Sequence, residues 1–285
     1  MAGSPAALTF AALLLSGCLV PGRARAASEM FPPVERILSG LGSGSPLEPA
    51  VEPDLRDSPG PAKDVAWLRR ELQHDDWDRR RSAVEQAGRP ANDAAVPYLG
   101  AVVLGLNEDP RVRVAAAVAL ARIGHPSSAR FLGEALRGDP EVDVRFAAAL
   151  ALGAGFEGTA GSLCRSLRED GSWWVRYAAA VALGRAAGPG GEEPLAEAAA
   201  GDAAWQVRLE ATRALGSIRS PRSAKALARP LADPDPGVRA AAAMALGEVG
   251  GEPALRALQA ALGEETDSFQ RRVLTQALQK VLARL

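Results

Sequence analysis

Small and apolar residues recur every three or four positions through most of the chain, which is typical of one buried face of an α-helix. The clearest copies run from Val112 to Leu120, from Val175 to Gly184, from Val207 to Gly216 and from Val238 to Gly247. Each begins with Val-Arg. With that arginine as position zero, small or apolar residues fall at −1, +3, +6 and +7, so the pattern predicts one amphipathic helix per copy.

The arginine marks a regular repeat. It recurs at Arg80, Arg113, Arg145, Arg176, Arg208, Arg239 and Arg271, at intervals of 31 to 33 residues. Seven copies at one period indicate a repeat architecture. A second apolar segment precedes the Val-Arg helix in several copies and predicts the other helix of each repeat: Ser128 to Leu136, Ala160 to Leu167, Ser223 to Leu231 and Ala254 to Leu262. Residues 62–285 are therefore expected to form an all-α array of about seven helical hairpins.

Acidic residues and prolines separate the two helices of each repeat. Asp109-Pro110, Asp139-Pro140 and Asp233-Pro234 are expected to place a side-chain acceptor at the free N–H groups of the next helix, followed by a proline that its first turn tolerates. Asp170 and Asp202 occupy the corresponding place. The repeated arginines and these aspartates are expected to form a structural ladder of ion pairs along the turns.

Position +8 is occupied by glycine in most copies: Gly88, Gly153, Gly184, Gly216 and Gly247. Because the apolar pattern continues beyond it, we interpret this glycine as a point of close approach between helices rather than a helix end.

The motif Val-Arg-x-x-Ala-Ala-x-Ala-Leu-Gly after an Asp-Pro turn resembles the HEAT-like repeats of phycocyanobilin lyase subunits. The resemblance covers residues 62–285. It implies a right-handed α–α superhelix, a curved solenoid whose second helices line the concave side. The motif is scaffolding and does not by itself indicate an activity.

Positions +1 and +5 point away from the buried stripe, onto the side that the resemblance makes concave. In the inner repeats they are mostly apolar: Val114 and Val118, Phe146 and Leu150, Tyr177 and Val181, Leu209 with Arg213, and Ala240 with Met244. The terminal copies are polar, with Arg81 and Glu85 at one end and Arg272 and Gln276 at the other. This predicts an apolar interaction strip with a charged rim. The alternatives are burial between neighbouring helices, or a cover formed by the segment from Phe31 to Leu38.

Three tryptophans share position −3: Trp77, Trp173 and Trp205. Trp173 and Trp205 belong to adjacent repeats and form either a ligand-stacking ridge or packing that seals one turn onto the next. A basic cluster near the first repeat comprises Arg69, Arg70, Arg79, Arg80, Arg81 and Arg89. We interpret that cluster as a solvated cap of the array, with an anionic partner or lipid headgroups as the alternative.

The N-terminal residues predict export. Residues 1–22 carry no charged side chain, and the apolar run from Ala6 to Val20 is short for a membrane span. Leu15-Ser16-Gly17-Cys18 resembles a bacterial lipobox, which implies a signal peptide over 1–17 and lipidation at Cys18; cleavage after Ala26 is the alternative. Residues 18–61 are expected to be a flexible linker rich in Pro, Gly and Ser.

Composition narrows the function classes. The 33 basic and 34 acidic residues nearly cancel, which argues against a nucleic-acid partner. The two histidines, His74 and His125, lie in separate turns and neither is followed by Glu, so neither a di-iron site nor any other metal site is expected. No nucleophile elbow or phosphate-binding loop occurs, and Cys164 is interpreted as a structural thiol. We expect no catalytic residue and no cofactor.

The sequence therefore favours a non-catalytic scaffold or adaptor in the cell envelope, held at the membrane by its lipid anchor, that binds a protein partner on its concave face. The alternative is an enzyme subunit or chromophore-handling chaperone like the bilin lyases that the repeats resemble. A third hypothesis is a spacer without a discrete site.

Overall fold

The computed structural model describes residues 64–186 and 189–284, and within them all regular structure is helical. The predicted signal segment, Cys18, the linker and the segment from Phe31 to Leu38 lie outside the described residues. The chain divides into two compact parts, Met1–Leu72 and Gln73–Leu285. The described helix of the first part is α4 (Val65–Glu71), where the Asp64 carboxylate accepts a hydrogen bond from the Trp67 backbone N–H at 2.7 Å.

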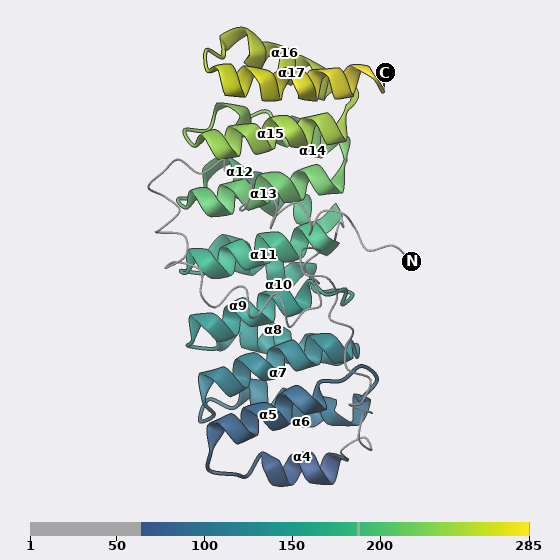
Figure 1. The fold of residues 1–285 in the computed structure, drawn as a ribbon, viewed down its shortest axis with the longest axis vertical. Helices are drawn as coiled ribbons and strands as arrows, with labels where there is room; N and C mark the ends of the chain where they lie inside the picture. Colours follow the sequence, from purple (N-terminus) through teal and green to yellow (C-terminus); the bar gives the residue numbers. More distant parts are fainter. Residues whose placement is uncertain (1–63, 187–188, 285) are drawn as a thin grey trace, which may run out of the picture. The chain divides into compact units, whose positions relative to one another are not determined.

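The second part is a stack of helical hairpins in two layers (Figure 1). The second helices of the repeats form one layer: α5 (Trp77–Ala87), α7 (Pro110–Ile123), α9 (Val142–Leu152), α11 (Trp173–Ala186), α13 (Trp205–Ile218), α15 (Pro236–Val249) and α17 (Ser268–Leu282). The first helices form the other: α6 (Val96–Leu104), α8 (Ser128–Gly138), α10 (Ala160–Glu169), α12 (Glu192–Gly201), α14 (Pro221–Ala226) and α16 (Gly251–Glu264). The predicted all-α solenoid is confirmed.

Short 3₁₀ helices complete three of the connections: η1 (Asp93–Ala95), η2 (Pro189–Gly191) and η3 (Pro230–Ala232). The predicted helix from Ser223 to Leu231 is wrong in its second half, because α14 ends at Ala226 and η3 follows. Pro230 has no backbone N–H to continue the helical hydrogen bonds and its ring obstructs the preceding turn. No described helix is both long and apolar enough to cross a membrane.

The positions that the periodicity predicted to be buried form the core. At position −1, Val112, Val144, Val175, Val207 and Val238 are all fully buried. At position +7, Leu120, Leu152, Leu183, Leu215 and Leu246 are at most 2% exposed. The core therefore repeats with the sequence, one valine and one leucine from each second helix facing the first-helix layer.

The glycine at +8 lies where neighbouring second helices touch. A Cβ added to Gly153 would lie 2.7 Å from the Cα of Ala182 on the next second helix, and one added to Gly184 would lie 2.8 Å from the Cβ of Ala214. Gly88, Gly216 and Gly247 meet the alanine at +6 of the following repeat in the same way. The predicted close approach is confirmed, although α5 and α9 also end at this position. Neighbouring second helices therefore pack closely on one another along the whole layer.

The repeated arginine joins two successive turns. Arg145 donates from Nη1 to the carbonyl oxygens of Asp139 and Pro140 in its own turn, and its Nε lies 2.9 Å from the Asp170 carboxylate in the next turn. The same bridge recurs in the pairs Arg113–Asp139, Arg176–Asp202 and Arg208–Asp233. Each aspartate also accepts the backbone N–H two residues ahead of it. The predicted ladder is present, and it links consecutive repeats.

The roles assigned to the Asp-Pro turns need correction. Asp109 does cap α7, accepting the Arg111 N–H at 2.9 Å, with Pro110 in the first turn. Asp139 and Asp233 instead lie at the ends of α8 and η3 and pair with the arginine of the preceding repeat. This turn is one residue shorter in the Arg113 repeat, so Glu108 takes the ladder position there and Asp109 is left to cap.

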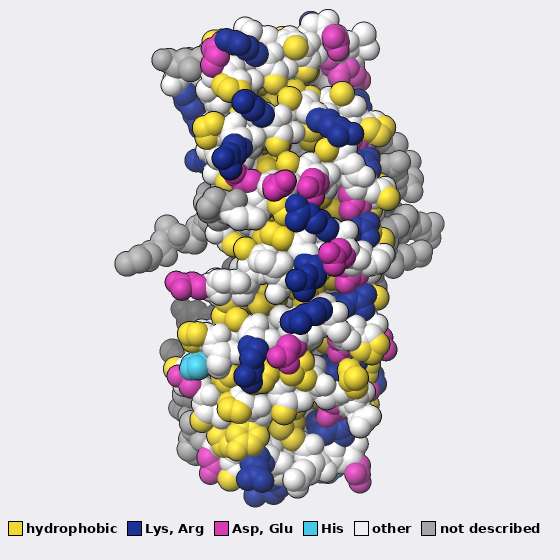
Figure 2. All heavy atoms as spheres, turned by 180° about the vertical axis from the view of Figure 1, so that it is seen from behind, with side chains coloured by type: hydrophobic (Ala, Val, Ile, Leu, Met, Phe, Trp, Pro, Cys, Tyr) yellow, Lys and Arg dark blue, Asp and Glu magenta, His cyan; other side chains and the backbone are white. Residues whose placement is uncertain are grey.

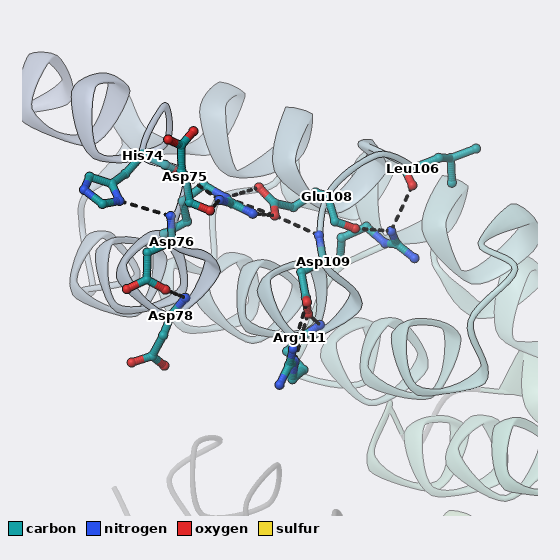
Figure 3. Close-up of polar contacts among 10 residues, drawn as sticks. His74, Asp75, Asp76, Asp78, Leu106, Glu108, Asp109 and Arg111 are labelled. Atoms are coloured by element: carbon teal, nitrogen blue, oxygen red, sulfur yellow. Dashed lines mark hydrogen bonds and ion pairs between the residues drawn. The ribbon is translucent and has the colours of Figure 1, made fainter.

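Figure 3 shows this first rung of the ladder. The Glu108 carboxylate accepts from Arg80 at 2.6 Å and from the Asp109 backbone N–H at 2.8 Å. Arg80 also donates to the carbonyl oxygens of His74 and Asp75. His74 Nδ1 accepts the Asp76 N–H, so its ring is engaged in the turn itself.

Candidate partner-binding face

The strip predicted at +1 and +5 lies on the side of the second helices that is opposite their buried positions −1 and +7, and we call this the outer side of the layer. The side chains of the strip differ widely in exposure. Met244 on α15 is 48% exposed. Val114 and Val118 on α7, Tyr177 and Val181 on α11, and Leu209 and Arg213 on α13 are half-buried. The expected accessibility of Phe146 and Leu150 on α9 is wrong, since they are only 5% and 2% exposed. The strip is therefore a partly open surface with a closed centre.

An aromatic cluster explains why Phe146 is covered. Its ring meets the Trp174 ring edge-on at a centroid distance of 5.9 Å, and Trp174 meets Tyr177 in the same way at 6.4 Å. Trp173 stacks on Trp174 at 4.3 Å. Edge-to-face and stacked aromatic pairs each add stability beyond the area they bury. We call Phe146, Trp173, Trp174 and Tyr177 the aromatic cluster.

The sequence interpretation missed Trp174. It stands at −2, and helical spacing places −2, +1 and +5 on one face, so its position next to Tyr177 could have been read from the repeat. The repetition of tryptophan at −3 in three repeats drew attention away from the single tryptophan at −2. The signal for Trp174 was that a tryptophan stands at −2 in one repeat and in no other.

Helix α13, which packs next to α11, carries an ion pair. Glu210, at +2, lies 3.8 Å from Arg213 and its side chain is only 16% exposed. Burial raises the pKa of the Glu210 carboxyl, and the charges of Arg213 and Arg185 act in the opposite direction. Burial likewise raises the pKa of Tyr177. These polar groups border the apolar strip and can orient a bound segment through hydrogen bonds and charge.

The predicted rim residues at the α5 end pair with each other. Arg81 contacts Glu85 at 2.5 Å and Asp78 at 2.8 Å on the same helix. Of the wider basic cluster, Arg80 is engaged by Glu108, while Arg69 and Arg70 belong to α4 in the first part of the chain. The cluster is thus divided between the two parts, and Arg70, Arg80 and Arg81 each pair with a carboxylate.

The tryptophans at −3 do not share one environment. Trp77 lies beneath the guanidinium of Arg111 from the next repeat, 3.4 Å from the ring centroid, so it helps to seal one turn onto the next. Trp173 stacks on Trp174, whereas Trp205 is 41% exposed. No ring contact joins Trp173 to Trp205 among the described residues, so the proposed ridge is not continuous.

Cys164 and His125 form structural hydrogen bonds. Cys164 is buried, its thiol donates to the Gly190 carbonyl at 3.5 Å, and burial raises its pKa. His125 interacts with Ser127 within its own turn. In the part of the chain that the structure describes, no group of three or more His, Cys, Asp or Glu side chains is placed to hold a metal ion.

The opposite side of the stack has a different surface. Figure 2 shows this side, which is formed by the first helices α6, α8, α10, α12, α14 and α16, with Lys, Arg, Asp and Glu side chains scattered among apolar groups. A scattered pattern of both charge signs is ordinary for a solvated protein surface. The second-helix layer, with apolar residues in register on successive helices, is the stronger candidate for recognition.

Comparison with known proteins gives the fold and family. No curated protein matches the chain. The solved structure of the Escherichia coli YibA protein is 21% identical, covering 78% of this chain and 82% of that one with a TM-score of 0.55. The CpcE–CpcF complex of phycocyanin lyase from a Nostoc species is 21% identical, covering 79% and 97%, with a TM-score of 0.46. Human deoxyhypusine hydroxylase is 24% identical, covering 76% and 84%, with a TM-score of 0.41.

At 21% identity, the likeness to YibA shows the fold alone. The family assignment comes from the sequence profile described as HEAT repeats, which matches residues 65–153, 129–199, 160–232 and 192–279. The overlapping matches take in α4 to α17 almost completely. The chain therefore belongs to the HEAT-repeat family.

Proposed function

We propose that this protein is a non-catalytic HEAT-repeat adaptor that binds a protein partner along the outer side of its second helices. The observation that carries the proposal is the row of apolar side chains in register on α7, α11, α13 and α15, of which Met244 is 48% exposed. Apolar groups gathered on one face of a soluble surface mark interaction sites more often than chance exposure does.

Because the centre of the strip is buried, a partner would contact the residues on either side of it. Phe146 and Leu150 form its floor, while Val181, Leu209 and Met244 supply the accessible apolar area. Partner affinity would come mainly from desolvation of these side chains, and Arg213 and Glu210 would fix the orientation of the bound segment.

We further propose that the protein is exported and lipid-anchored at Cys18, which would place the partner in the cell envelope. The support is the lipobox-like Leu15-Ser16-Gly17-Cys18. Mass spectrometry of the mature N-terminus separates the alternatives. A diacylated Cys18 supports the anchor, and a free Ala27 shows a secreted form without it.

Site-specific photocrosslinking tests the binding face. A photoreactive phenylalanine analogue is placed at Met244 in the full chain in its native cells, with a matched control at Leu106, a 65% exposed residue in the turn before α7. We expect a discrete adduct from Met244 and none from Leu106. The purified adduct partner should then bind the Met244→Asp variant at least about tenfold more weakly, with Leu106→Asp unchanged. Equal adducts from both positions, or equal affinities of both variants, would refute the proposal.

The aromatic cluster favours a second candidate, binding of a planar apolar small molecule as in a chromophore-handling chaperone. Such a ligand would stack near Trp174 and quench its fluorescence. Saturable quenching by a tetrapyrrole, lost in Tyr177→Leu and kept in Trp205→Leu, would favour this candidate over the protein-binding one.

A further inference from the structure

On two of the second helices, the apolar residues at +1 and +5 are followed four positions later by an arginine. We call each such set of three residues a row. On α7, Val114, Val118 and Arg122 follow one another at intervals of four residues, and on α11 Tyr177, Val181 and Arg185 do the same. An interval of four places side chains above one another on one helix face. Each row therefore runs from apolar residues to a cation at the C-terminal end of its helix.

Arg122 and Arg185 are exposed and form no ion pair with any described residue. Two arginines near the opposite ends of second helices are paired instead, since Arg111 pairs with Asp109 and Arg81 with Glu85. Arg122 and Arg185 therefore place open positive charge at one margin of the face, at the C-terminal ends of α7 and α11. A helix C-terminus does favour a basic residue, but this weak interaction with the helix dipole leaves the guanidinium donors available.

The electrostatics place Arg185 beside the apolar strip. Its positive charge lowers the pKa of both Tyr177 and Glu210, against the larger effect of burial, so all three groups are close enough to interact. A ligand anion drawn to Arg185 would hold its neighbouring atoms over Val181. Charge and apolar contact would then act on one bound segment.

We propose, building on the proposed function, that the partner segment is an extended acidic peptide. It runs across the second helices with carboxylates facing Arg122 and Arg185 and apolar side chains over Val118 and Val181. An extended chain fits because the rows lie on successive helices, and a ligand must cross the helices to contact more than one of them.

The helix spacing sets the register of the acidic residues. Neighbouring packed helices lie about 8–10 Å apart, so α7 and α11, separated by α9, are about 16–20 Å apart. An extended chain rises about 3.3 Å per residue, which makes this span five to six residues. Side chains on one side of an extended chain recur at even intervals, so the carboxylates should stand six residues apart.

Fluorescence anisotropy with the full chain tests this register. The probe is a labelled 12-residue peptide with Glu at positions 3 and 9 among Val, Leu and Thr; the control peptide has the same composition with both Glu residues adjacent. We expect the spaced peptide to bind at least about fivefold more tightly, with affinity falling as salt rises.

Matched variants assign the contacts. Arg122→Gln and Arg185→Gln should each weaken binding of the spaced peptide by about two- to fivefold, and together by the product of the two factors. Arg137→Gln, an exposed arginine in the last turn of the first helix α8, is the control and should leave binding unchanged. Thermal melting of all three variants separates loss of binding from loss of folding.

Each other outcome overturns the acidic-peptide proposal. Equal binding of the two peptides, or none, would reject the register. Arginine-dependent binding to phosphatidylglycerol vesicles without peptide binding would assign the margin to a membrane surface. Loss of peptide binding in Val181→Asp but not in the arginine variants would reject the acidic partner and leave the apolar binding face standing. Failure of the proposed function is seen independently, as identical crosslinking from Met244 and Leu106.

Discussion

The buried rung of the ladder allows a quantitative test of what holds the repeats together. The side chains of Arg113 and Asp139 are 3% and 2% exposed, and Arg113 also donates to the Glu108 carbonyl oxygen at 2.6 Å. Arg113→Met removes the cation and leaves the buried Asp139 carboxylate without its ion-pair partner. Breaking a buried pair in this way costs about 3–5 kcal/mol, because the remaining charge loses both water and its partner.

The same chain contains a matched exposed pair. Arg168 and Glu197 also join successive repeats at 2.7 Å, but their side chains are 42% and 52% exposed. Solvent screens such a pair, so Arg168→Met should cost about 0–1 kcal/mol. Urea unfolding followed by circular dichroism measures both free energies of unfolding in the same buffer.

A double variant isolates the buried charge. Asp139→Asn keeps an acceptor for the Glu141 N–H, which the Asp139 carboxylate receives at 2.8 Å, while removing the negative charge. Adding Asp139→Asn to Arg113→Met should therefore recover a large part of the lost stability. Equal losses for Arg113→Met and Arg168→Met, or no recovery in the double variant, would refute the view that the uncompensated buried carboxylate dominates.

Further predictions concern packing, pH and thiol reactivity. Gly153→Ala should lower the free energy of unfolding by about 1–3 kcal/mol because of overpacking, whereas Gly161→Ala, with no atom within 4 Å of the added Cβ, should be neutral or stabilising in the same urea assay. The hydrogen bond from Arg111 lowers the pKa of Asp109 to about 2, so its stabilising contribution is present above the unfolded value of 3.8 and is lost as the pH falls through 2. The difference in urea midpoint between the wild type and Asp109→Asn should shrink on acidification; a constant difference would contradict this. Cys164 should react with a thiol reagent only after unfolding, and rapid labelling of the native protein would contradict its burial.

The sequence alone predicted the helices of the repeat and the residues that they bury. The spacing of Val, Ala and Leu around each Val-Arg predicted the second helices, and their buried positions −1 and +7 are the ones observed. The glycine at +8 predicted the close contact that Gly184 makes with Ala214. Both predictions succeed because helical periodicity and the volume of a missing Cβ are properties of short segments, and a repeat restates them many times.

The candidate site depended on contacts between repeats, which spacing within one repeat does not contain. The sequence placed Phe146 and Leu150 on the outer side of the second helices, but only the tertiary structure showed that both are buried, with Trp174 packed against Phe146. A turn shortened by one residue moved the ladder carboxylate from Asp109 to Glu108. Whether a side chain on a helix face meets solvent or a neighbour is decided by how the next helix approaches, and that is set by the tertiary structure.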